Sequence, residues 1–142
     1  MRVLDILLVE DNPGDIRLTQ EALRETRMPS TLHVAKNGVA AMDFLRRRGE
    51  FSDAPRPDLV LLDLNLPRLS GREVLKQIKD DPHLRRIPVI VLSTSEGQRD
   101  VTESYDLHAN CYINKPVDFE HFLRVISAIE QFWFGLVKLP KP

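Results

Sequence analysis

Hydrophobic and polar positions along the chain alternate in blocks that predict five strands and five helices. Two apolar runs without a polar residue, 59–62 and 89–92, predict strands that are buried on both faces. The other expected strands are shorter apolar segments at 3–9, 31–35 and 111–114. The expected helices have apolar residues at helical spacing and cover about 13–26, 39–47, 71–79 and 98–106, and a last one begins near 118.

The regular alternation of these blocks indicates the class of fold. Strands that alternate with helices form parallel sheets with right-handed crossovers, and the helices cover both faces. We therefore expect an α/β fold, a doubly wound (βα)5 unit with a parallel five-stranded sheet. The pattern does not determine the strand order, although 2-1-3-4-5 is a common arrangement for five such units. The 142 residues suit one domain, 1–142, with an extended C-terminal helix and tail from about 132 and no attached output domain.

The net charge of −1 and the composition exclude several classes of protein. A nearly neutral chain lacks the strongly basic balance that is typical of nucleic-acid or anionic-membrane binding. No apolar run approaches the ~20 residues that span a bilayer, and Asp5 and Glu10 interrupt the N-terminal segment that a signal peptide would need. Cys111 is the single cysteine, so no internal disulfide is possible. We expect a cytoplasmic protein without a nucleic-acid or membrane partner.

Chemically reactive side chains occur where four of the expected strands end. Glu10 and Asp11 follow the first strand, and Asp63 follows the third. Ser93 ends the fourth strand, and Lys115 follows the fifth. The carboxyl ends of parallel strands lie along one edge of the sheet, where open α/β folds bind their ligands. We therefore expect these side chains to gather in one pocket.

Three carboxylates in one pocket repel one another. Two unit charges ~4 Å apart at an effective dielectric constant of ~20 interact by roughly 4 kcal/mol. A divalent cation removes this repulsion, and carboxylate and carbonyl oxygens suit Mg²⁺. We expect Asp11, Asp63 and the backbone carbonyl of Asn65 to bind Mg²⁺ directly. Glu10 is expected to act through water.

The same pocket has the parts that phosphoryl transfer needs. A carboxylate oxygen can act as a nucleophile toward phosphorus and form an aspartyl phosphate. The ammonium of Lys115, the hydroxyl of Ser93 and a bound cation would neutralise charge on the phosphoryl oxygens. Asp63 is the expected nucleophile because it ends the central strand.

Each of these residues also has an ordinary structural interpretation. The acids after the first strand can favour a helix N-terminus. Ser93 can be a loop hydroxyl, and Lys115 with Pro116 can form a turn that ends the last strand. Their joint occurrence at the strand ends is what favours a functional pocket.

Together these residues resemble the receiver domains of two-component response regulators over about 3–134. The resemblance is carried by Glu10, Asp11, Asp63, Leu66, Pro67, Ser93, Tyr112, Lys115 and Pro116. It implies the strand order 2-1-3-4-5, and Asp63 as the acceptor of phosphate from a phosphohistidine of a sensor histidine kinase. It also implies that Ser93 and Tyr112 form the switch that moves the fourth helix, and that the bond from Lys115 to Pro116 is cis. A receiver is not a dedicated enzyme.

Further stretches are similar to a narrower group, the small stand-alone regulators that partner bacterial and cyanobacterial phytochrome kinases. They are 9–15, 107–113, 132–134 and 137–140. This similarity implies that the kinase partner is of the phytochrome type.

The last helix has more apolar positions than one buried face requires. One stripe is expected to cover the sheet: Phe119, Phe122, Ile126, Ile129 and Trp133. A second row contains Val125, Phe132, Leu136 and Leu139. We favour a homodimer that buries the second row, because large exposed apolar patches are uncommon on monomers. The alternative is that 136–140 packs on its own domain.

Two other functions stay open from the residues alone. A phosphatase of the haloacid-dehalogenase type also uses an aspartate nucleophile, but it needs a second aspartate two residues later, where this chain has Asn65. A non-phosphorylated adaptor would carry the same residues in an inactive pocket. Nucleotide binding is disfavoured because no glycine-rich loop follows the first strand. Asn65 and Ser95 flank the expected pocket, and their effect on phosphate hydrolysis has no predicted direction.

Overall fold

The computed structural model describes residues 3–26, 29–94, 97–116 and 118–140. Its strands are β1 (Leu4–Val9), β2 (Ser30–Ala35), β3 (Leu59–Leu62), β4 (Val89–Ser93) and β5 (Cys111–Asn114). Its α-helices are α1 (Pro13–Arg24), α2 (Gly38–Arg46), α3 (Gly71–Asp80), α4 (Gln98–Asp106) and α5 (Phe119–Glu130). Each expected strand and helix is therefore present, and the bounds differ from the prediction by at most a few residues.

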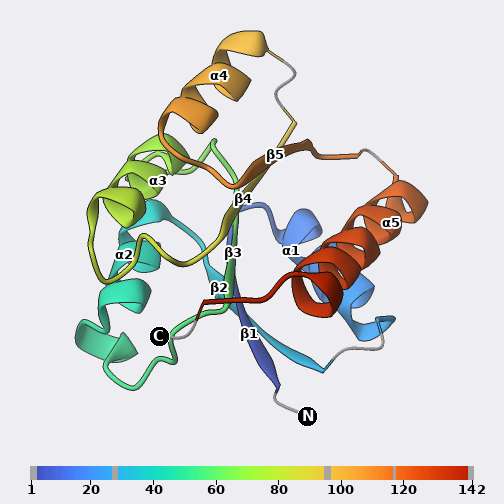
Figure 1. Ribbon diagram of the computed structural model, residues 1–142, viewed down its shortest axis with the longest axis horizontal. Helices are drawn as coiled ribbons and strands as arrows, with labels where there is room; N and C mark the ends of the chain where they lie inside the picture. The colour runs from blue at the N-terminus through green and yellow to red at the C-terminus, as the bar shows by residue number, and fades with distance from the viewer. Residues whose placement is uncertain (1–2, 27–28, 95–96, 117, 141–142) are drawn as a thin grey trace.

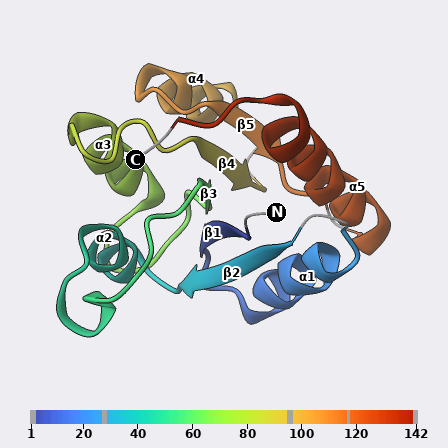
Figure 2. The same ribbon diagram turned by 60° about the horizontal axis from the view of Figure 1, so that its bottom comes forward.

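The strands form one parallel sheet in the order β2-β1-β3-β4-β5 (Figure 1). Helices cover both faces of this sheet. α1 and α5 lie side by side on one face, and α2, α3 and α4 lie on the other side (Figure 2). The predicted α/β class and strand order are confirmed.

β3 lies at the centre of the sheet because both of its faces are apolar. Its four residues are at most 1% exposed. Leu59 and Leu61 join the core beneath α1 and α5. Val60 and Leu62 join the core beneath α2 and α3. A strand buried on both faces needs a neighbouring strand on each side, and β1 and β4 supply them.

The register of the sheet aligns the carboxyl ends of its strands. Val9 of β1 lies opposite Leu62 of β3, and Leu62 lies opposite Val91 of β4. Ser93 of β4 lies opposite Asn114 of β5. The residues that follow these strands therefore share one edge of the sheet.

The predicted start of α1 is confirmed. The side chain of Asn12 accepts a hydrogen bond from the Asp15 N–H at 3.1 Å, and Pro13 is the first helical residue. Only residues 10–12 separate β1 from α1, so the first turn of α1 lies beside the edge where β1 ends. Three other helices have a side-chain cap of the same kind, from Asn37, Ser70 and Asp118.

Two segments differ from the sequence-based prediction. A 3₁₀-helix, η1 (Gly49–Phe51), lies within the predicted loop between α2 and β3. α5 continues as a π-helix, η2 (Gln131–Leu136), and the chain is extended after it. The wider π turn and the following extended backbone end the helical row. Leu139 therefore lies in the tail and not on the helix with Phe132 and Leu136.

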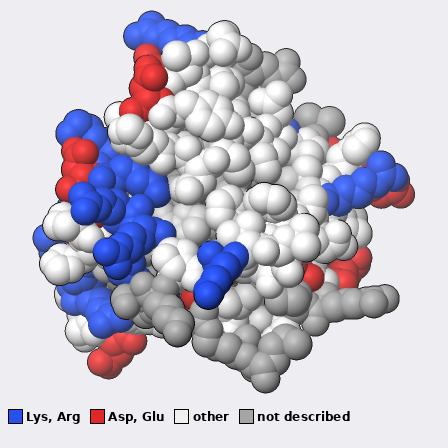
Figure 3. Space-filling view, viewed as in Figure 1, with Lys and Arg blue, Asp and Glu red and all other residues white. Residues whose placement is uncertain are grey.

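Charge is distributed unevenly over the surface. Lys and Arg side chains gather along the side formed by α2 and α3, whereas uncharged residues cover the middle of the same face (Figure 3). The net charge of −1 means that acidic residues elsewhere balance these cations. Within the described ranges, no helix has both the length and the apolar character needed to cross a membrane.

Candidate functional site

The carboxyl ends of β1 and β3 bring three acidic side chains together. One oxygen from each of Glu10, Asp11 and Asp63 lies within 4.8 Å of the other two. The Glu10 N–H donates to the Ala35 carbonyl at 3.0 Å. The Asp63 N–H donates to the Val9 carbonyl at 3.0 Å, so the ladder of the sheet extends into the site. The predicted acid cluster is therefore present.

The ammonium of Lys115 lies inside this cluster. Its side chain is 5% exposed and forms an ion pair and a hydrogen bond with Glu10. Its Nζ lies 3.5 Å from Oδ2 of Asp63. The backbone N–H of Lys115 donates to the Ser93 carbonyl at 2.7 Å, which aligns the end of β5 with the end of β4. The predicted strand-end residues thus meet at one edge.

A further carboxylate, from Asp15, also reaches the ammonium. Oδ2 of Asp15 lies 2.9 Å from Nζ of Lys115, and the Asp15 side chain is 28% exposed. Sequence reasoning missed this residue. Its position offered a signal, because an acid in the first turn of the helix after β1 lies beside the strand ends.

Burial and crowding shift the acid–base properties of the cluster. Burial raises the pKa of Glu10 to about 7, against the opposing effect of Lys115 and with a further contribution from Asp63. For Lys115, burial alone would lower the pKa, but its contacts with Glu10, Asp15 and Asp63 outweigh burial and raise it. The ammonium therefore stays charged near neutral pH. The excess of carboxylates favours additional positive charge in the pocket.

The loop after β3 orients the Asp63 carboxylate. The Asn65 N–H donates to Oδ1 of Asp63 at 3.1 Å, whereas Oδ2 is the oxygen that faces Lys115. Gly71 packs against the backbone of this loop. A Cβ added there would lie 2.2 Å from the Asp63 carbonyl oxygen and 2.5 Å from the Leu64 Cα. Glycine is needed at this position because the two backbone segments approach so closely.

The two predicted switch residues lie on adjacent strands. Ser93 is fully buried at the end of β4. Tyr112 is half-buried on β5, and its N–H donates to the hydroxyl of Tyr105 on α4 at 3.2 Å. Their action as a switch stays a prediction. Ser95, which was expected to flank the pocket, lies outside the described residues.

The chain matches a known protein family along most of its length. Residues 6–127 match the family described as the response regulator receiver domain. The chain belongs to this family. The resemblance inferred from the strand-end residues is thereby confirmed, and a phosphatase of the haloacid-dehalogenase type is not favoured.

Relatives of this receiver domain include regulators of known structure. Response regulator Rcp1 of Synechocystis sp. is 49% identical over 135 residues, which cover 95% of this chain and 92% of that protein. The Mn²⁺-bound form of Rcp1 has a TM-score of 0.92 and 48% identity, covering 97% of this chain and 99% of that one. The phosphorylated cyanobacterial phytochrome response regulator RcpA has a TM-score of 0.95 and 50% identity, covering 99% of this chain and 100% of that one.

The donor set of this receiver domain fits a divalent cation. Glu10, Asp11 and Asp63 offer clustered carboxylate oxygens, which are the ligands that hard divalent cations prefer. Asp15 adds a further negative charge, and Lys115 supplies a single positive charge against these acids. A bound dication would offset most of the remaining negative charge. Rcp1 has been solved with Mn²⁺ bound, so this relative binds such an ion.

One expectation that came from the resemblance is wrong. The described residues contain no cis peptide bond, so the bond from Lys115 to Pro116 is trans. X–Pro bonds favour trans by about 0.5–1 kcal/mol unless the surroundings select the other isomer. Lys115 reaches the acid cluster with the bond in the trans form.

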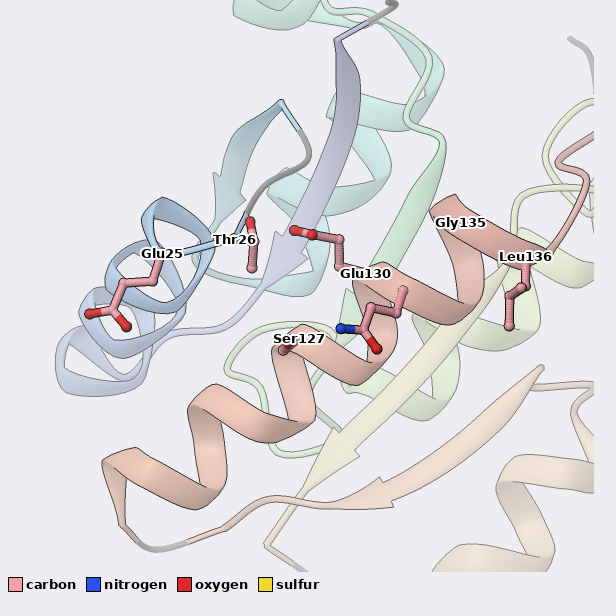
Figure 4. Close-up of a pocket in the computed structure, with 7 residues that line it drawn as sticks. Glu25, Thr26, Ser127, Glu130, Gly135 and Leu136 are labelled. Carbon is pink, nitrogen blue, oxygen red and sulfur yellow. The ribbon is translucent and has the colours of Figure 1, made fainter.

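A cavity of about 500 Å³ lies away from this site, between the C-terminal end of α1 and α5 (Figure 4). Its lining includes Glu25, Ser127 and Glu130, and none of the lining residues belongs to the strand-end cluster. The cavity therefore does not form part of the predicted pocket.

Proposed function

We propose that this receiver domain acts in the cytoplasm as a response regulator whose Asp63 accepts a phosphoryl group from a phosphohistidine. The donor is a sensor histidine kinase of the phytochrome type, and the phosphorylated form signals by binding other proteins. The observation that supports this proposal is the position of Asp63. Its carboxylate ends the central strand, with Nζ of Lys115 3.5 Å from Oδ2 and two other carboxylates within 4.8 Å.

The proposed reaction uses the residues around Asp63 in distinct ways. An Asp63 carboxylate oxygen bonds to phosphorus while the bond from phosphorus to the histidine nitrogen breaks and its electron pair stays on the imidazole. The Asn65 N–H holds Oδ1 and so fixes the orientation of the carboxylate. The Lys115 ammonium and the Ser93 hydroxyl stabilise charge on the phosphoryl oxygens. Attack of water on phosphorus later restores the carboxylate and releases inorganic phosphate.

Mg²⁺ is the proposed cofactor of this reaction. Asp11, Asp63 and the backbone carbonyl of Asn65 would hold it, and Glu10 would act through water. When bound, the cation would neutralise negative charge on the phosphoryl oxygens. In this proposal the buried Glu10 carboxylate does not coordinate the cation directly, because it already accepts a hydrogen bond from Lys115.

The phytochrome-type kinase is supported by the relatives. RcpA, a cyanobacterial phytochrome response regulator solved in its phosphorylated form, matches 99% of this chain at 50% identity. A likeness that extends over both the receiver core and the C-terminal segment supports a shared class of partner.

The proposed output is a movement of α4 controlled by Ser93 and Tyr112. Among the α4 residues only Ser104 is buried, so few apolar contacts hold this helix in place. The Tyr105 hydroxyl joins α4 to the backbone of Tyr112. Reorientation of Ser93 toward a phosphoryl group would free space for the Tyr112 ring and thereby shift α4.

Acetyl phosphate and Mg²⁺ should add one phosphoryl group to the full chain. The expected result follows because the pocket supplies the nucleophile and the cations that the transfer requires. Intact-mass spectrometry measures the product, which should disappear after treatment with hydroxylamine, as an acyl phosphate does, and should not form when EDTA removes the metal. A chain that stays unmodified at saturating donor and Mg²⁺ would contradict the proposal. Transfer from an autophosphorylated phytochrome kinase that is no faster than transfer from an unrelated histidine kinase would contradict the choice of partner.

We also propose a homodimer formed through the C-terminal helix. Of the four expected interface residues, Phe132 is 52% and Leu136 is 80% exposed, whereas Val125 and Leu139 are half-buried. An apolar cavity of about 440 Å³ lies next to Phe132, between α5 and β5. Its lining includes Cys111, Ile113, Val125, Phe132 and Trp133. Uncharged residues cover the middle of the face seen in Figure 3, as a contact surface between copies requires.

The tail itself packs only in part on its own domain. The Val137 N–H donates to the Phe132 carbonyl at 2.8 Å, and Pro140 lies beside Pro57 and Pro88. Figure 1 shows the tail crossing the sheet toward the side of α2. These contacts leave the side chain of Leu136 on the surface, where it is available for the proposed dimer contact.

Replacing Leu136 with serine should weaken the dimer at least about tenfold, because the lost apolar burial contributes roughly 1.5–3 kcal/mol. Analytical ultracentrifugation across the micromolar range measures the dissociation constant. Val3→Ser serves as the matched control, because Val3 is also an exposed apolar residue, at 49% exposure, but it does not belong to the proposed dimer interface. A wild-type chain that is monomeric throughout this range would contradict the proposed dimer. A Leu136→Ser variant that dimerises like wild type would show that Leu136 is not part of the interface.

A further inference from the structure

Lys115 distributes its contacts unequally among the carboxylates around it. Its ammonium donates hydrogen bonds to Glu10 and to Asp15, with 2.9 Å to Oδ2 of Asp15. Oδ2 of Asp63 lies 3.5 Å away, which is longer than the ~2.7–2.9 Å of a charge-assisted hydrogen bond. An ammonium has three donors. Two of the three are therefore directed to carboxylates other than the proposed phosphate acceptor.

Asp15 is held in place by its own helix. Its N–H donates to Oδ1 of Asn12 at 3.1 Å, and its carbonyl accepts a hydrogen bond from the Thr19 hydroxyl at 2.9 Å. Thr19 is 1% exposed, and Ile16 anchors the same turn in the core at 8% exposure. The backbone of Asp15 is therefore fixed, so its carboxylate can follow Lys115 toward Asp63 only as far as rotation of this short side chain allows.

The geometry points to Asp15 as a positioning residue that holds Lys115 away from Asp63 in the unphosphorylated protein. This inference rests on the proposed function. When acetyl phosphate reacts, phosphorus bonds to an Asp63 oxygen, the bond to the acetyl oxygen breaks, and acetate leaves with the electron pair. The new phosphoryl oxygens then compete with Asp15 for the ammonium. Asp15 thereby lowers the affinity of the pocket for the phosphoryl group and raises the donor concentration that is needed.

A purely structural role for Asp15 makes a different prediction. An acid in the first turn stabilises a helix through its dipole. Removal of Asp15 would then lower the melting temperature, and the affinity of the pocket for a phosphoryl group would stay the same. Measurement of that affinity separates the two roles.

Beryllofluoride binds an acceptor carboxylate as a mimic of the phosphoryl group and is the probe for this test. The full chain is titrated at saturating Mg²⁺, because loss of a carboxylate also lowers the affinity for the cation. Asp15→Asn should lower the dissociation constant of beryllofluoride about three- to tenfold, since the Lys115 ammonium is no longer shared with Asp15. The acetyl phosphate concentration for the half-maximal initial rate of phosphorylation should fall by a similar factor.

Two further variants make the result specific. Asp15→Glu keeps the negative charge and should restore a dissociation constant close to that of wild type. Glu21→Gln makes the same chemical change on α1 at a residue paired with Arg17 at 3.7 Å, and it should leave the constant unchanged. If Asp15→Asn does not fold, Asp15→Ser replaces it, because serine also removes the negative charge.

The outcomes separate this inference from the proposed function. The inference about Asp15 is overturned if Asp15→Asn binds beryllofluoride with a dissociation constant within about twofold of the Glu21→Gln value, or above that value. Wild-type protein that binds beryllofluoride and takes phosphate would then still support the proposed function. Wild-type protein that does neither overturns the proposed function itself.

Discussion

Replacing Asp63 with asparagine will abolish phosphorylation by acetyl phosphate, with the initial rate falling more than about 100-fold. The amide keeps the size of the side chain and an oxygen that can accept the Asn65 N–H, but it is not a nucleophile toward phosphorus. The fold should not suffer. Loss of one charge relieves repulsion with Glu10, whose raised pKa includes a contribution from Asp63. The melting temperature should therefore be equal to that of wild type or higher.

Asp53→Asn is the matched control for this experiment. Asp53 is an exposed aspartate in the loop between α2 and β3, outside the strand-end cluster, and the same substitution there should leave the rate unchanged. The two variants are compared on phosphate-affinity gels and by intact-mass spectrometry. If Asp63→Asn incorporates phosphate at the wild-type rate, another residue is the acceptor and the central assignment is wrong.

Gly71→Ala will destabilise the protein by about 3 kcal/mol or more, which corresponds to a fall in melting temperature of roughly 10 °C. The added Cβ would lie 2.2 Å from the Asp63 carbonyl oxygen and 2.5 Å from the Leu64 Cα. Both are backbone atoms, so no side chain can rotate away to make room. The backbone that carries Asp63 must move instead. Scanning calorimetry measures the loss, and the phosphorylation rate of the folded variant should fall as well.

Gly135→Ala provides the control for Gly71→Ala. Gly135 lies in the exposed η2 segment, and a Cβ added there would have no atom within 4 Å. Alanine favours helical backbone over glycine by about 0.8–1.0 kcal/mol, so stability should stay the same or rise slightly. A loss in Gly135→Ala as large as that in Gly71→Ala would show that close packing at Gly71 is not the cause.

Much of the fold was predictable because it depends on local pattern. The uninterrupted apolar runs of β3 and β4 identified the central strands, and Asn12 with Pro13 identified the start of α1. The alternation of strands and helices then determined the fold class, while the strand order came from general precedent and from the family resemblance. The expected meeting of Asp63 and Lys115 followed from the parallel sheet alone, because its strands all end at one edge.

Other features of the site could not be predicted from pattern. Asp15 and Lys115 are 100 residues apart, and their contact depends on how α1 docks on the sheet. The close approach of Gly71 to Asp63 depends on the path of the loop after β3. Lys115 was assigned a cis bond to Pro116 by resemblance, and the structure has it trans.

The amino-acid order therefore determined the elements, the fold class and the edge at which the acids gather, because hydrophobic periodicity acts over a few residues and parallel strands share a direction. The tertiary structure decided how Lys115 is shared among its carboxylates, and that Leu136 stays exposed while Leu139 turns into the tail. These outcomes depend on distances between elements that are far apart in the chain. Such distances are set only when helices and sheet pack against one another.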